Sequence, residues 1–564
     1  AVQANSCSIH LNSFTGSTMA ELNGGQIIAK QLKRAGIDTI FGVVGGPMIQ
    51  VFAAAQAEGI TVVNCRHEES AAFAATAWGY IKKKAGVMVA ASGPGMTNAI
   101  TPLYVATESA MPLVVLGGSG AAQTRGLGGF QETDQVALAK SACKWAIQVD
   151  STERIPEYLH LALGRATSGR PGGVYLDFPG NLIANTIDED RLRYRDDPTT
   201  RTAPYPDPSS VEAVAGMLAT AKRPLVLVGK GAAWADAGPA LTQLVRRGIP
   251  FLASPMGRGT LPDDDPMCVS AARSAALSGA DAIFMVGGRF NWIFQFGRPP
   301  RFAEDVRIAQ VDVVAEEFHS AANVEIGIQA DAAVTVEHLN GALDGRSLAA
   351  ESGWLASLKE SATRNEAAIA EQMSSDSTPI NHYRLVREVR DAISRETAVS
   401  VDGEMTMAVA RAVLPAYNPR IRLNSGTTGC MGTGVPYAVG AKLANPDQPS
   451  VALVGDYAFG AAGMEVETCA RVGIPVVFVV SNNGGIAGHS IQDRMFAPDA
   501  PPIAALMQAE FHMMGPMVGG FGRKVEDPAE VGPTIKEAIA ANTVAVINVI
   551  TDPKGGRRGS NYLG

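Results

Sequence analysis

The sequence predicts an α/β protein of three doubly wound parallel-sheet domains. Short apolar runs that end in Gly or Asp recur between stretches with apolar residues at helical spacing, a pattern typical of parallel strands joined by helices. The chain also has the length for several domains, because 564 residues at roughly 150 per domain correspond to three or four.

The strand-like runs fall into three blocks. The first, between Thr39 and Gly180, contains TIFGVVGG, GVMVAASGPG, PLVVLGGSG and GGVYLDFPG. The second runs from RPLVLVGKG to VRIAQVDV, and the third holds AVSVDGE, SVALVGD, IPVVFVVSNNGG and TVAVINVIT. Polar, Pro-containing stretches near 187–210 and 346–379 are typical of linkers. We therefore expect domains at 19–190, 205–345 and 375–552, an unstructured extension at 1–18 and a tail at 553–564.

Charge and composition exclude several classes of protein. The 47 Lys and Arg residues against 55 Asp and Glu give a net charge of -8, so there is no basic excess for a nucleic-acid backbone. No apolar run approaches the roughly 18 residues of a membrane span, and no signal peptide is apparent. The six cysteines lack C-x-x-C spacing, which favours free thiols. We expect a cytoplasmic protein with no nucleic-acid or membrane partner.

Two polar strand ends in the third block predict a metal site. One strand ends at Gly455-Asp456 and another at Asn482-Asn483, 27 residues later (483 minus 456). This spacing fits one helical crossover, so both ends should emerge side by side at the carboxyl edge of a parallel sheet. Carboxylate, amide and backbone carbonyl oxygens suit Mg²⁺ or Ca²⁺. The pattern indicates a cation that bridges to a diphosphate; two ordinary helix caps are the alternative.

The run GDYAFGAAGMEVETCARVGIPVVFVVSNNGG resembles the motif by which thiamine-diphosphate enzymes hold Mg²⁺. The resemblance extends over Met19 to Asp552 and implies the three-domain fold of that family. It implies that Asp456, Asn483 and the Gly485 carbonyl are metal ligands, with diphosphate oxygens and water completing the octahedron. It also implies cofactor contacts from neighbouring positions, namely Gly455, Tyr457, Ala458 and Ile486.

A second resemblance lies in the first block, at NCRHEESAAFAATAWGY. It implies that Glu68 is the catalytic glutamate, which hydrogen-bonds the aminopyrimidine ring of the cofactor and favours its imino tautomer. On the residues alone, a solvated acid pair in the first turn of a helix is the favoured interpretation of Glu68 and Glu69. The segment ASGPGMTNAI, 91–100, matches the family's turn beside the pyrimidine, with Gly95 and Asn98 as contacts; ordinary turn chemistry is the alternative.

A third resemblance is NSGTTGCMGTGVPYAVGAKLANP, similar to the family's loop before the metal motif. It implies that Met431 supports the bent cofactor, although a Met that fills a core gap is the alternative. The segment VDGEMTM, 401–407, implies pyrimidine contacts from Glu404 and Met405. Because Glu68 and Asp456 belong to different domains, the resemblance implies an active site between two subunits, hence at least a homodimer and usually a homotetramer.

The middle block resembles two acyl-CoA enzyme classes. The segments VGKGAAWADA, SPMGRGTLPDDDP and SAARSAALSGADAIFMVGGRFNW are similar to those of oxalyl-CoA decarboxylases and 2-hydroxyacyl-CoA lyases, whose middle domain binds a nucleotide. This implies ADP or another nucleotide near Lys230, Arg273, Arg289 and Asp312. Acetolactate synthases share the layout but bind flavin there, so a carboligase of that kind remains an alternative.

The loop GGFQETDQ separates the two acyl-CoA classes. Where the decarboxylases have Tyr-Glu, this chain has Phe130-Gln131, as the lyases do. An amide can hydrogen-bond a neutral hydroxyl and places no negative charge beside the substrate. We therefore expect a carbon–carbon lyase that converts a 2-hydroxyacyl-CoA into formyl-CoA and an aldehyde or ketone, with Gln131 orienting the hydroxyl. An oxalyl-CoA decarboxylase is the alternative.

Two substitutions and the tail bear on the acyl-CoA substrate. Gly46 stands where related enzymes often have Ile, which leaves room for a branched substrate such as 2-hydroxyisobutyryl-CoA, and Ala487 stands where the decarboxylase has Tyr. In the tail DPKGGRRGSNYLG, we expect Arg557 and Arg558 to hold CoA phosphates while the segment folds over the active site; a solvated terminus is the alternative.

Overall fold

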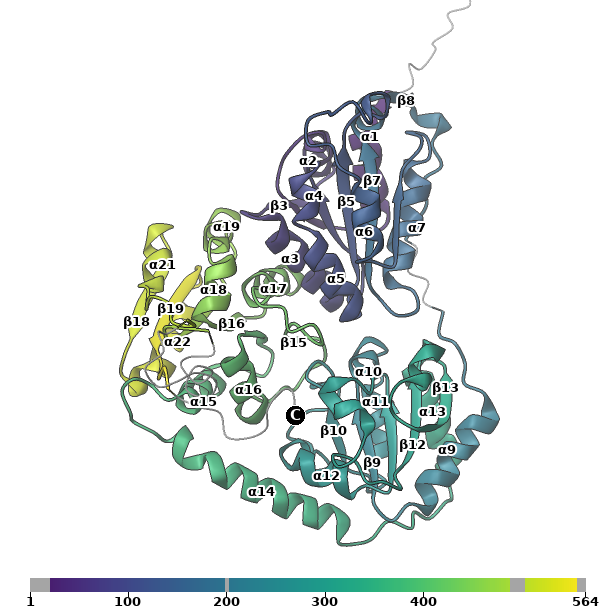
Figure 1. Cartoon of the computed structure of the whole chain (residues 1–564), viewed down its shortest axis with the longest axis vertical. Coiled ribbons are helices and arrows are strands. Elements are labelled where there is room, and N and C mark those ends of the chain that lie inside the picture. Colours follow the sequence, from purple (N-terminus) through teal and green to yellow (C-terminus); the bar gives the residue numbers. More distant parts are fainter. Residues whose placement is uncertain (1–20, 198–201, 487–502, 555–564) are drawn as a thin grey trace, which may run out of the picture.

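The computed structural model describes residues 21–197, 202–486 and 503–554. In these ranges three parallel sheets follow one another along the chain, and each carries helices on both faces (Figure 1). The predicted α/β class with three doubly wound domains is therefore confirmed. None of the described helices is both long and apolar enough to cross a membrane.

The first sheet has the strand order β3-β2-β4-β5-β7-β6, with all neighbouring pairs parallel. Its strands are β2 (Thr39–Gly42), β3 (Thr61–Asn64), β4 (Gly86–Ala90), β5 (Leu113–Ser119), β6 (Trp145–Gln148) and β7 (Gly173–Pro179). Its helices are α1 (Gly24–Arg34), α2 (Ile49–Ala57), α3 (Glu68–Lys82), α4 (Pro94–Thr97), α5 (Ile100–Glu108), α6 (Gln135–Lys140), α7 (Ile155–Thr167) and α8 (Gly180–Ala184). The order reverses between β2 and β4, so the loops that follow these two strands diverge at that point.

A small antiparallel ribbon completes the first domain. It pairs β1 (Glu21–Asn23) with β8 (Thr186–Asp188). The polar stretch expected as a linker near 187–210 therefore starts with a strand. Its composition is that of a linker, but pairing with β1, in which Glu21 lies opposite Asp188, gives it order, and the Thr186 hydroxyl donates to Glu21 Oε2 at 3.2 Å.

The middle sheet has the order β10-β9-β11-β12-β13, again parallel throughout. Its order reverses between β9 and β11. The strands β9 and β11 are buried at every position, as expected where helices cover both faces of a parallel sheet. The strands are β9 (Pro224–Val228), β10 (Phe251–Ala253), β11 (Ala282–Val286), β12 (Arg307–Asp312) and β13 (Val324–Gln329), and the helices are α9 (Pro208–Thr220), α10 (Lys230–Trp234), α11 (Gly238–Val245), α12 (Arg273–Gly279) and α13 (Ala332–Leu343).

The third sheet has the order β15-β14-β16-β17-β19-β18, also parallel, and reverses between β14 and β16. Its strands are β14 (Ala398–Asp402), β15 (Arg422–Leu423), β16 (Ser450–Gly455), β17 (Val477–Asn482), β18 (Phe521–Val525) and β19 (Ala545–Ile550). Its helices are α15 (His382–Ala392), α16 (Glu404–Val413), α17 (Gly434–Ala444), α18 (Asp456–Ala462), α19 (Glu465–Val472), α21 (Met514–Met517) and α22 (Val531–Ala540).

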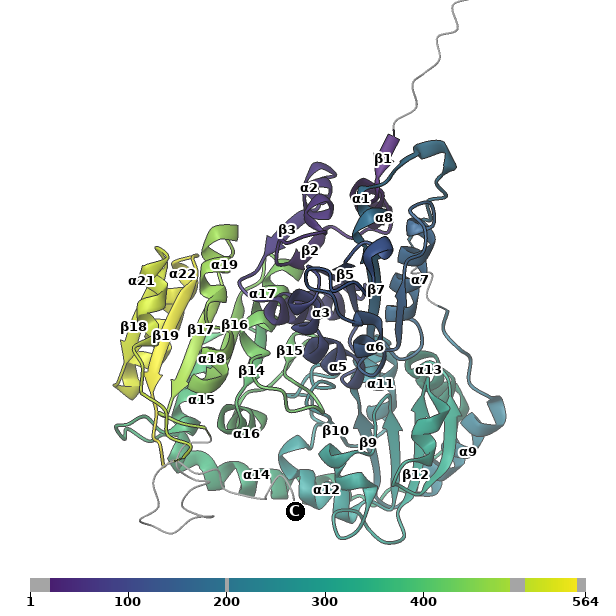
Figure 2. The same cartoon turned by 45° about the horizontal axis from the view of Figure 1, so that its top comes forward.

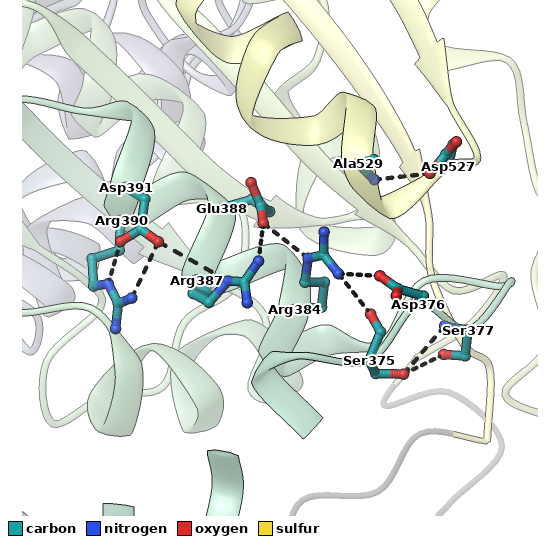
Figure 3. A network of polar contacts seen from close by, with 10 residues as sticks. All are labelled: Ser375, Asp376, Ser377, Arg384, Arg387, Glu388, Arg390, Asp391, Asp527 and Ala529. Carbon is teal, nitrogen blue, oxygen red and sulfur yellow. Dashed lines mark hydrogen bonds and ion pairs between the residues drawn. The ribbon is translucent and has the colours of Figure 1, made fainter. Parts of the chain in front are cut away.

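The helix α14 (Trp354–Met373) leads from the middle domain to the third, and an arginine fastens the segment that follows it (Figure 3). Arg384 of α15 donates to the carbonyl of Ser375 at 3.1 Å and to the carboxylate of Asp376. It also donates to Glu388, one turn further along α15, at 2.8 Å. The end of the linker is therefore held against the first helix of the third domain.

Helices α3 and α17 join the first and third domains, and they lie side by side in both views (Figures 1 and 2). The Ala-rich α3 is buried from Ser70 to Tyr80. A Cβ atom at Gly440 would lie 2.1 Å from the Ala74 carbonyl oxygen, so the helices approach to backbone contact. Phe73 and Tyr437 pack edge to face across the same junction, with ring centroids 5.8 Å apart. Small residues at the crossing thus fix the two domains against each other.

Replacing Gly440 by Ala should lower the unfolding temperature, because the added methyl group would overlap the Ala74 carbonyl and force the helices apart. Overpacking of this kind costs roughly 1–3 kcal/mol. Gly216 in α9 provides the control, since a Cβ there would meet nothing within 4 Å. Gly216→Ala should stabilise by up to about 1 kcal/mol. Scanning calorimetry measures both variants, and a Gly440→Ala protein that unfolds at the wild-type temperature would contradict this packing.

Candidate active site

Three neighbouring strands of the third domain, β14, β16 and β17, lie side by side in its sheet (Figure 2). β14 pairs with β16, and β16 pairs with β17, in parallel register with Asp402 beside Val454 and Gly455 beside Ser481. The three strands therefore end at the same edge of the sheet. At that edge lie Glu404, Asp456 and the Asn482-Asn483 pair. The edge is also the point where strand order reverses, the usual ligand-binding position in such sheets.

Asp456 and Asn483 converge on one backbone N–H group at this edge. The amide of Gly485 lies 3.1 Å from Asp456 Oδ2 and 3.3 Å from Asn483 Oδ1. Both side chains are buried, and burial raises the pKa of Asp456. A Cβ at Gly485 would lie 2.7 Å from the Ala504 carbonyl oxygen, so the close approach of these segments requires glycine. Two oxygen donors from separate loops thus lie in one protected position.

The donor set fits a hard cation. Among the described residues no cluster of three or more His, Cys, Asp or Glu side chains is present. A cation here would be held by one carboxylate, one amide oxygen and backbone carbonyls, which leaves coordination positions for further oxygen ligands. These ligand types suit Mg²⁺ bound together with a diphosphate.

In the first domain, Glu68 is the first residue of α3, next to the turn that carries Gly95 and Asn98. Asn98 Nδ2 donates to Glu68 Oε2 at 2.9 Å. A Cβ at Gly95 would lie 3.4 Å from Glu68 Oε1, so the turn passes directly beside the carboxyl group. The three residues singled out in this domain as cofactor contacts therefore form one group.

Gly46 and Gln131 are brought together by Ser92, which sequence reasoning did not single out. The backbone N–H of Ser92 donates to the Gly46 carbonyl at 3.3 Å, and its hydroxyl donates to Gln131 Oε1 at 2.8 Å. A Cβ at Gly46 would meet nothing within 4 Å, so space lies open there. The neighbouring Phe130 side chain is 86% exposed. Ser92 follows β4, and Gly46 follows β2, at the reversal of the first sheet.

Glu465 is a second residue that the sequence did not reveal. Its carboxylate, buried at the start of α19, accepts the Arg66 backbone N–H at 3.1 and 3.2 Å and the Thr468 hydroxyl. Burial raises the pKa of Glu465. The contact holds the start of α3, and with it Glu68, against the third domain. Since Arg66 and Glu465 are 399 positions apart, no local pattern signals the pair.

A cavity of about 680 Å³ lies where the middle sheet reverses its order. Lys230, Arg289 and Asp312 all line it, while Arg273 lies behind the wall, stacked on Phe294 and donating to the Ile293 carbonyl at 2.7 Å. Burial raises the pKa of Asp312 to about 6. Burial lowers the pKa of Lys230, whose ammonium donates to the Ser109 and Ala110 carbonyls.

The other domains contribute to the same cavity. His160, Arg165 and Arg170 reach it from the first domain, and Gly426 and Thr427 reach it from the third. His160, Arg165 and Arg170 carried no signal in the sequence, because they lie far from the Gly-rich strand ends of the middle block. Gly426 and Thr427 belong to the segment that the sequence connected with the cofactor. The cavity is thus built at a junction of three domains.

The loop from Asn424 to Thr433 carries Met431 and is fastened to the middle domain. Trp292 Nε1 donates to the Thr427 carbonyl at 2.9 Å, and Asn291 Nδ2 donates to the Thr427 hydroxyl at 2.7 Å. Met431, Glu404 and Met405 are all half-buried. Ala487, Arg557 and Arg558 lie outside the described residues, as does most of the tail.

Comparison with protein-family models assigns each domain. Residues 22–138 match the thiamine pyrophosphate enzyme N-terminal TPP binding domain, 211–339 its central domain and 402–549 its C-terminal TPP binding domain. The chain belongs to the thiamine pyrophosphate enzyme family. The two outer domains are therefore those that bind thiamine diphosphate, as the glutamate and the polar strand ends predict.

Relatives within this family match over nearly their whole length. A 2-hydroxyacyl-CoA lyase of Oryza sativa subsp. japonica is 37% identical over 557 residues, 95% of this chain and 96% of the relative. The 2-hydroxyacyl-CoA lyase 1 of Homo sapiens is 34% identical over 567 residues, 98% of each chain. An oxalyl-CoA decarboxylase of Escherichia coli K12 is 35% identical over 545 residues, 95% of this chain and 96% of the relative.

Proposed function

We propose that this thiamine-diphosphate enzyme is a carbon–carbon lyase that cleaves a 2-hydroxyacyl-CoA into formyl-CoA and an aldehyde or ketone. The observation that carries the proposal is the Gln131 amide beside the open space at Gly46. An uncharged amide suits the neutral hydroxyl of a 2-hydroxyacyl group, and the open space suits a substituent on the same carbon. Overall identity does not separate lyases from decarboxylases, because both match at similar levels.

The reaction balances without a further reactant. The bond between C1 and C2 of the acyl group breaks, C2 keeps its oxygen as a carbonyl after the hydroxyl proton leaves, and C1 gains a proton to become the formyl carbon. Thiamine diphosphate, when bound, supplies a carbon nucleophile and an electron sink for this chemistry. Glu68 would hold the pyrimidine end, and Gln131 would orient the substrate hydroxyl. The remaining proposed cofactor contacts are Gly95, Asn98, Glu404, Met405, Met431, Gly455, Tyr457, Ala458 and Ile486.

Incubation with three acyl-CoA compounds tests the proposal. With lactyl-CoA and 2-hydroxyisobutyryl-CoA we expect formyl-CoA together with acetaldehyde and acetone, respectively. Turnover of oxalyl-CoA alone, with release of carbon dioxide, would identify a decarboxylase instead. A protein that purifies with bound flavin and joins two 2-oxoacids would identify a carboligase.

We infer that Asp456, Asn483 and the Gly485 carbonyl would hold Mg²⁺ for binding of the diphosphate, because the two side chains converge on one buried position and offer hard oxygen ligands. Asp456→Ala should weaken Mg²⁺-dependent binding of thiamine diphosphate by on the order of 100-fold, since even outer-shell partners of a metal contribute 10- to 100-fold. Asp447→Ala, which removes an exposed carboxylate from the same domain, should bind normally. Unchanged affinity of Asp456→Ala by calorimetry would refute this metal site.

Glu68→Gln should bind thiamine diphosphate but exchange the thiazolium C2 proton more slowly, by on the order of 100-fold or more, because an amide cannot share a proton with the pyrimidine ring. Glu69→Gln provides the matched control, one position further along α3, and should exchange at the wild-type rate. Hydrogen–deuterium exchange followed by NMR of the quenched cofactor measures both. Equal rates in the two variants would remove Glu68 from this role.

Gly46→Ile should discriminate between substrates by their bulk, because the added side chain would fill the open space. We expect kcat/KM to fall at least about fivefold more for 2-hydroxyisobutyryl-CoA than for lactyl-CoA, since overpacking costs roughly 1–3 kcal/mol. The two substrates serve as mutual controls within one variant. An equal loss for both would show that Gly46 does not determine the size of the substrate.

The cavity of the middle domain is proposed to bind ADP or another nucleotide. Arg289 supplies positive charge for phosphates, Lys230 lines the same cavity, and Asp312 at the end of β12 is placed to accept ribose hydroxyls. Because the pKa of Asp312 is about 6, ADP should bind more tightly at pH 7.5 than at pH 5.5. Calorimetric titration at the two pH values measures the difference.

A homodimer at minimum, and a tetramer by extension, is proposed from the exposed apolar side chains beside the site. Phe130, Tyr457 and Met464 are all exposed, and a second copy of the chain would cover such side chains.

A cytoplasmic location agrees with the five described cysteines, which are free thiols. The role of the tail in closing over acyl-CoA remains part of the proposal and rests on Arg557 and Arg558.

A further inference from the structure

Gln131 is held in an unusual backbone conformation next to a glycine. Its φ of 56° lies in the left-handed region, which residues with a side chain rarely adopt. A Cβ at Gly93 would lie 2.7 Å from the Gln131 carbonyl oxygen and 2.8 Å from its Cβ, so the two segments touch along their backbones. Such a conformation persists only where the surroundings impose it.

A buried polar network around Gln135 holds the loop that carries Gln131. Gln135, four residues after Gln131, accepts the Gly93 N–H at 2.6 Å and donates to the Gly118 carbonyl at 2.9 Å and to Asp177 Oδ1 at 2.8 Å. Gln135 and Asp177 are both buried, so these bonds are shielded from water. The loop that carries Gln131 is thereby fixed to β5, β7 and the turn after β4.

A hydrogen bond from Ser92 orients the side-chain amide of Gln131. Ser92 is 5% exposed, and its hydroxyl has one proton to donate. Gln131 Oε1 is 2.8 Å away, whereas the Gly46 carbonyl is 3.5 Å away and already accepts the Ser92 backbone N–H. The proton therefore goes to Gln131. Oε1 therefore faces Ser92, and no described residue accepts a hydrogen bond from Nε2.

We propose that Ser92 is a positioning residue that makes Gln131 a hydrogen-bond donor to the C2 oxygen of the substrate. This rests on the proposed lyase function and deepens it. An N–H group directed at the C2 oxygen stabilises that oxygen as the hydroxyl loses its proton, because charge grows there before the C–C bond breaks. A carboxamide has no titratable group to take the hydroxyl proton, so the base is a different group.

A double-mutant cycle tests the role of Ser92. Ser92→Ala should lower kcat roughly five- to tenfold, the effect of one hydrogen bond, and leave KM and thiamine-diphosphate affinity within about twofold. In a Gln131→Ala background, adding Ser92→Ala should change kcat less than about twofold, because Ser92 acts only through Gln131. Thr97→Ala removes a hydroxyl from the same turn, bonded to the Pro94 carbonyl, and should retain wild-type kcat. A Ser92→Ala effect that persists in the Gln131→Ala background would overturn the inference.

Gln131→Glu gives an independent test that leaves Ser92 in place. The Ser92 proton would bind one carboxylate oxygen, and the other oxygen would face the substrate as a negatively charged acceptor. We expect kcat below that of Gln131→Ala; a Glu variant as fast as wild type would contradict donation by Gln131. A wild-type protein that cleaves no 2-hydroxyacyl-CoA would refute the proposed function itself, and this result is seen before any variant is made.

Discussion

The reversal of strand order in a parallel sheet is the constraint on which the candidate sites depend. Where the order reverses, the loops after two adjacent strands run to opposite sides of the sheet. They leave a crevice at the carboxyl edge of the sheet, and residues from both loops line it. All three sheets reverse in this way. Gly46 and Ser92 lie at the first reversal, Lys230 at the second, and Glu404 with Asp456 at the third. The same reversal of strand order thus places Gly46 with Ser92, the middle-domain cavity and the polar strand ends of the third domain.

Contacts between the domains then fix the positions of these sheet edges relative to one another. The close approach at Gly440 joins α3 to α17, and Glu465 holds the start of α3 against α19. Glu68 is the first residue of α3, so its position relative to the third domain follows from both contacts. The loop with Met431 precedes α17 and is tied to the middle domain through Thr427, which also lines the cavity. The cavity and the loop that carries Met431 therefore have Thr427 in common.

The fold class and the adjacency of Asp456 and Asn483 could be predicted from the sequence, because strand apolarity, strand-end residues and crossover length are local properties. The contacts of Ser92, Gln135 and Glu465 could not, since their partners lie far away in the chain and ordinary serines, glutamines and glutamates carry no pattern. Arg273 is a residue that the sequence pattern singled out but that does not line the cavity. Its segment is part of the middle-domain pattern, but stacking on Phe294 keeps its side chain out of the cavity.

Deuterium labelling at C1 of the acyl group is the most direct test of cleavage between C1 and C2. The wild-type protein with thiamine diphosphate and Mg²⁺ is incubated with a 2-hydroxyacyl-CoA in deuterium oxide, and the products are measured by mass spectrometry. We expect formyl-CoA with one deuterium on the formyl carbon, in equal amount to the released aldehyde or ketone, because C1 takes its new hydrogen from solvent. Intact substrate, or a carbonyl product without labelled formyl-CoA, would contradict it.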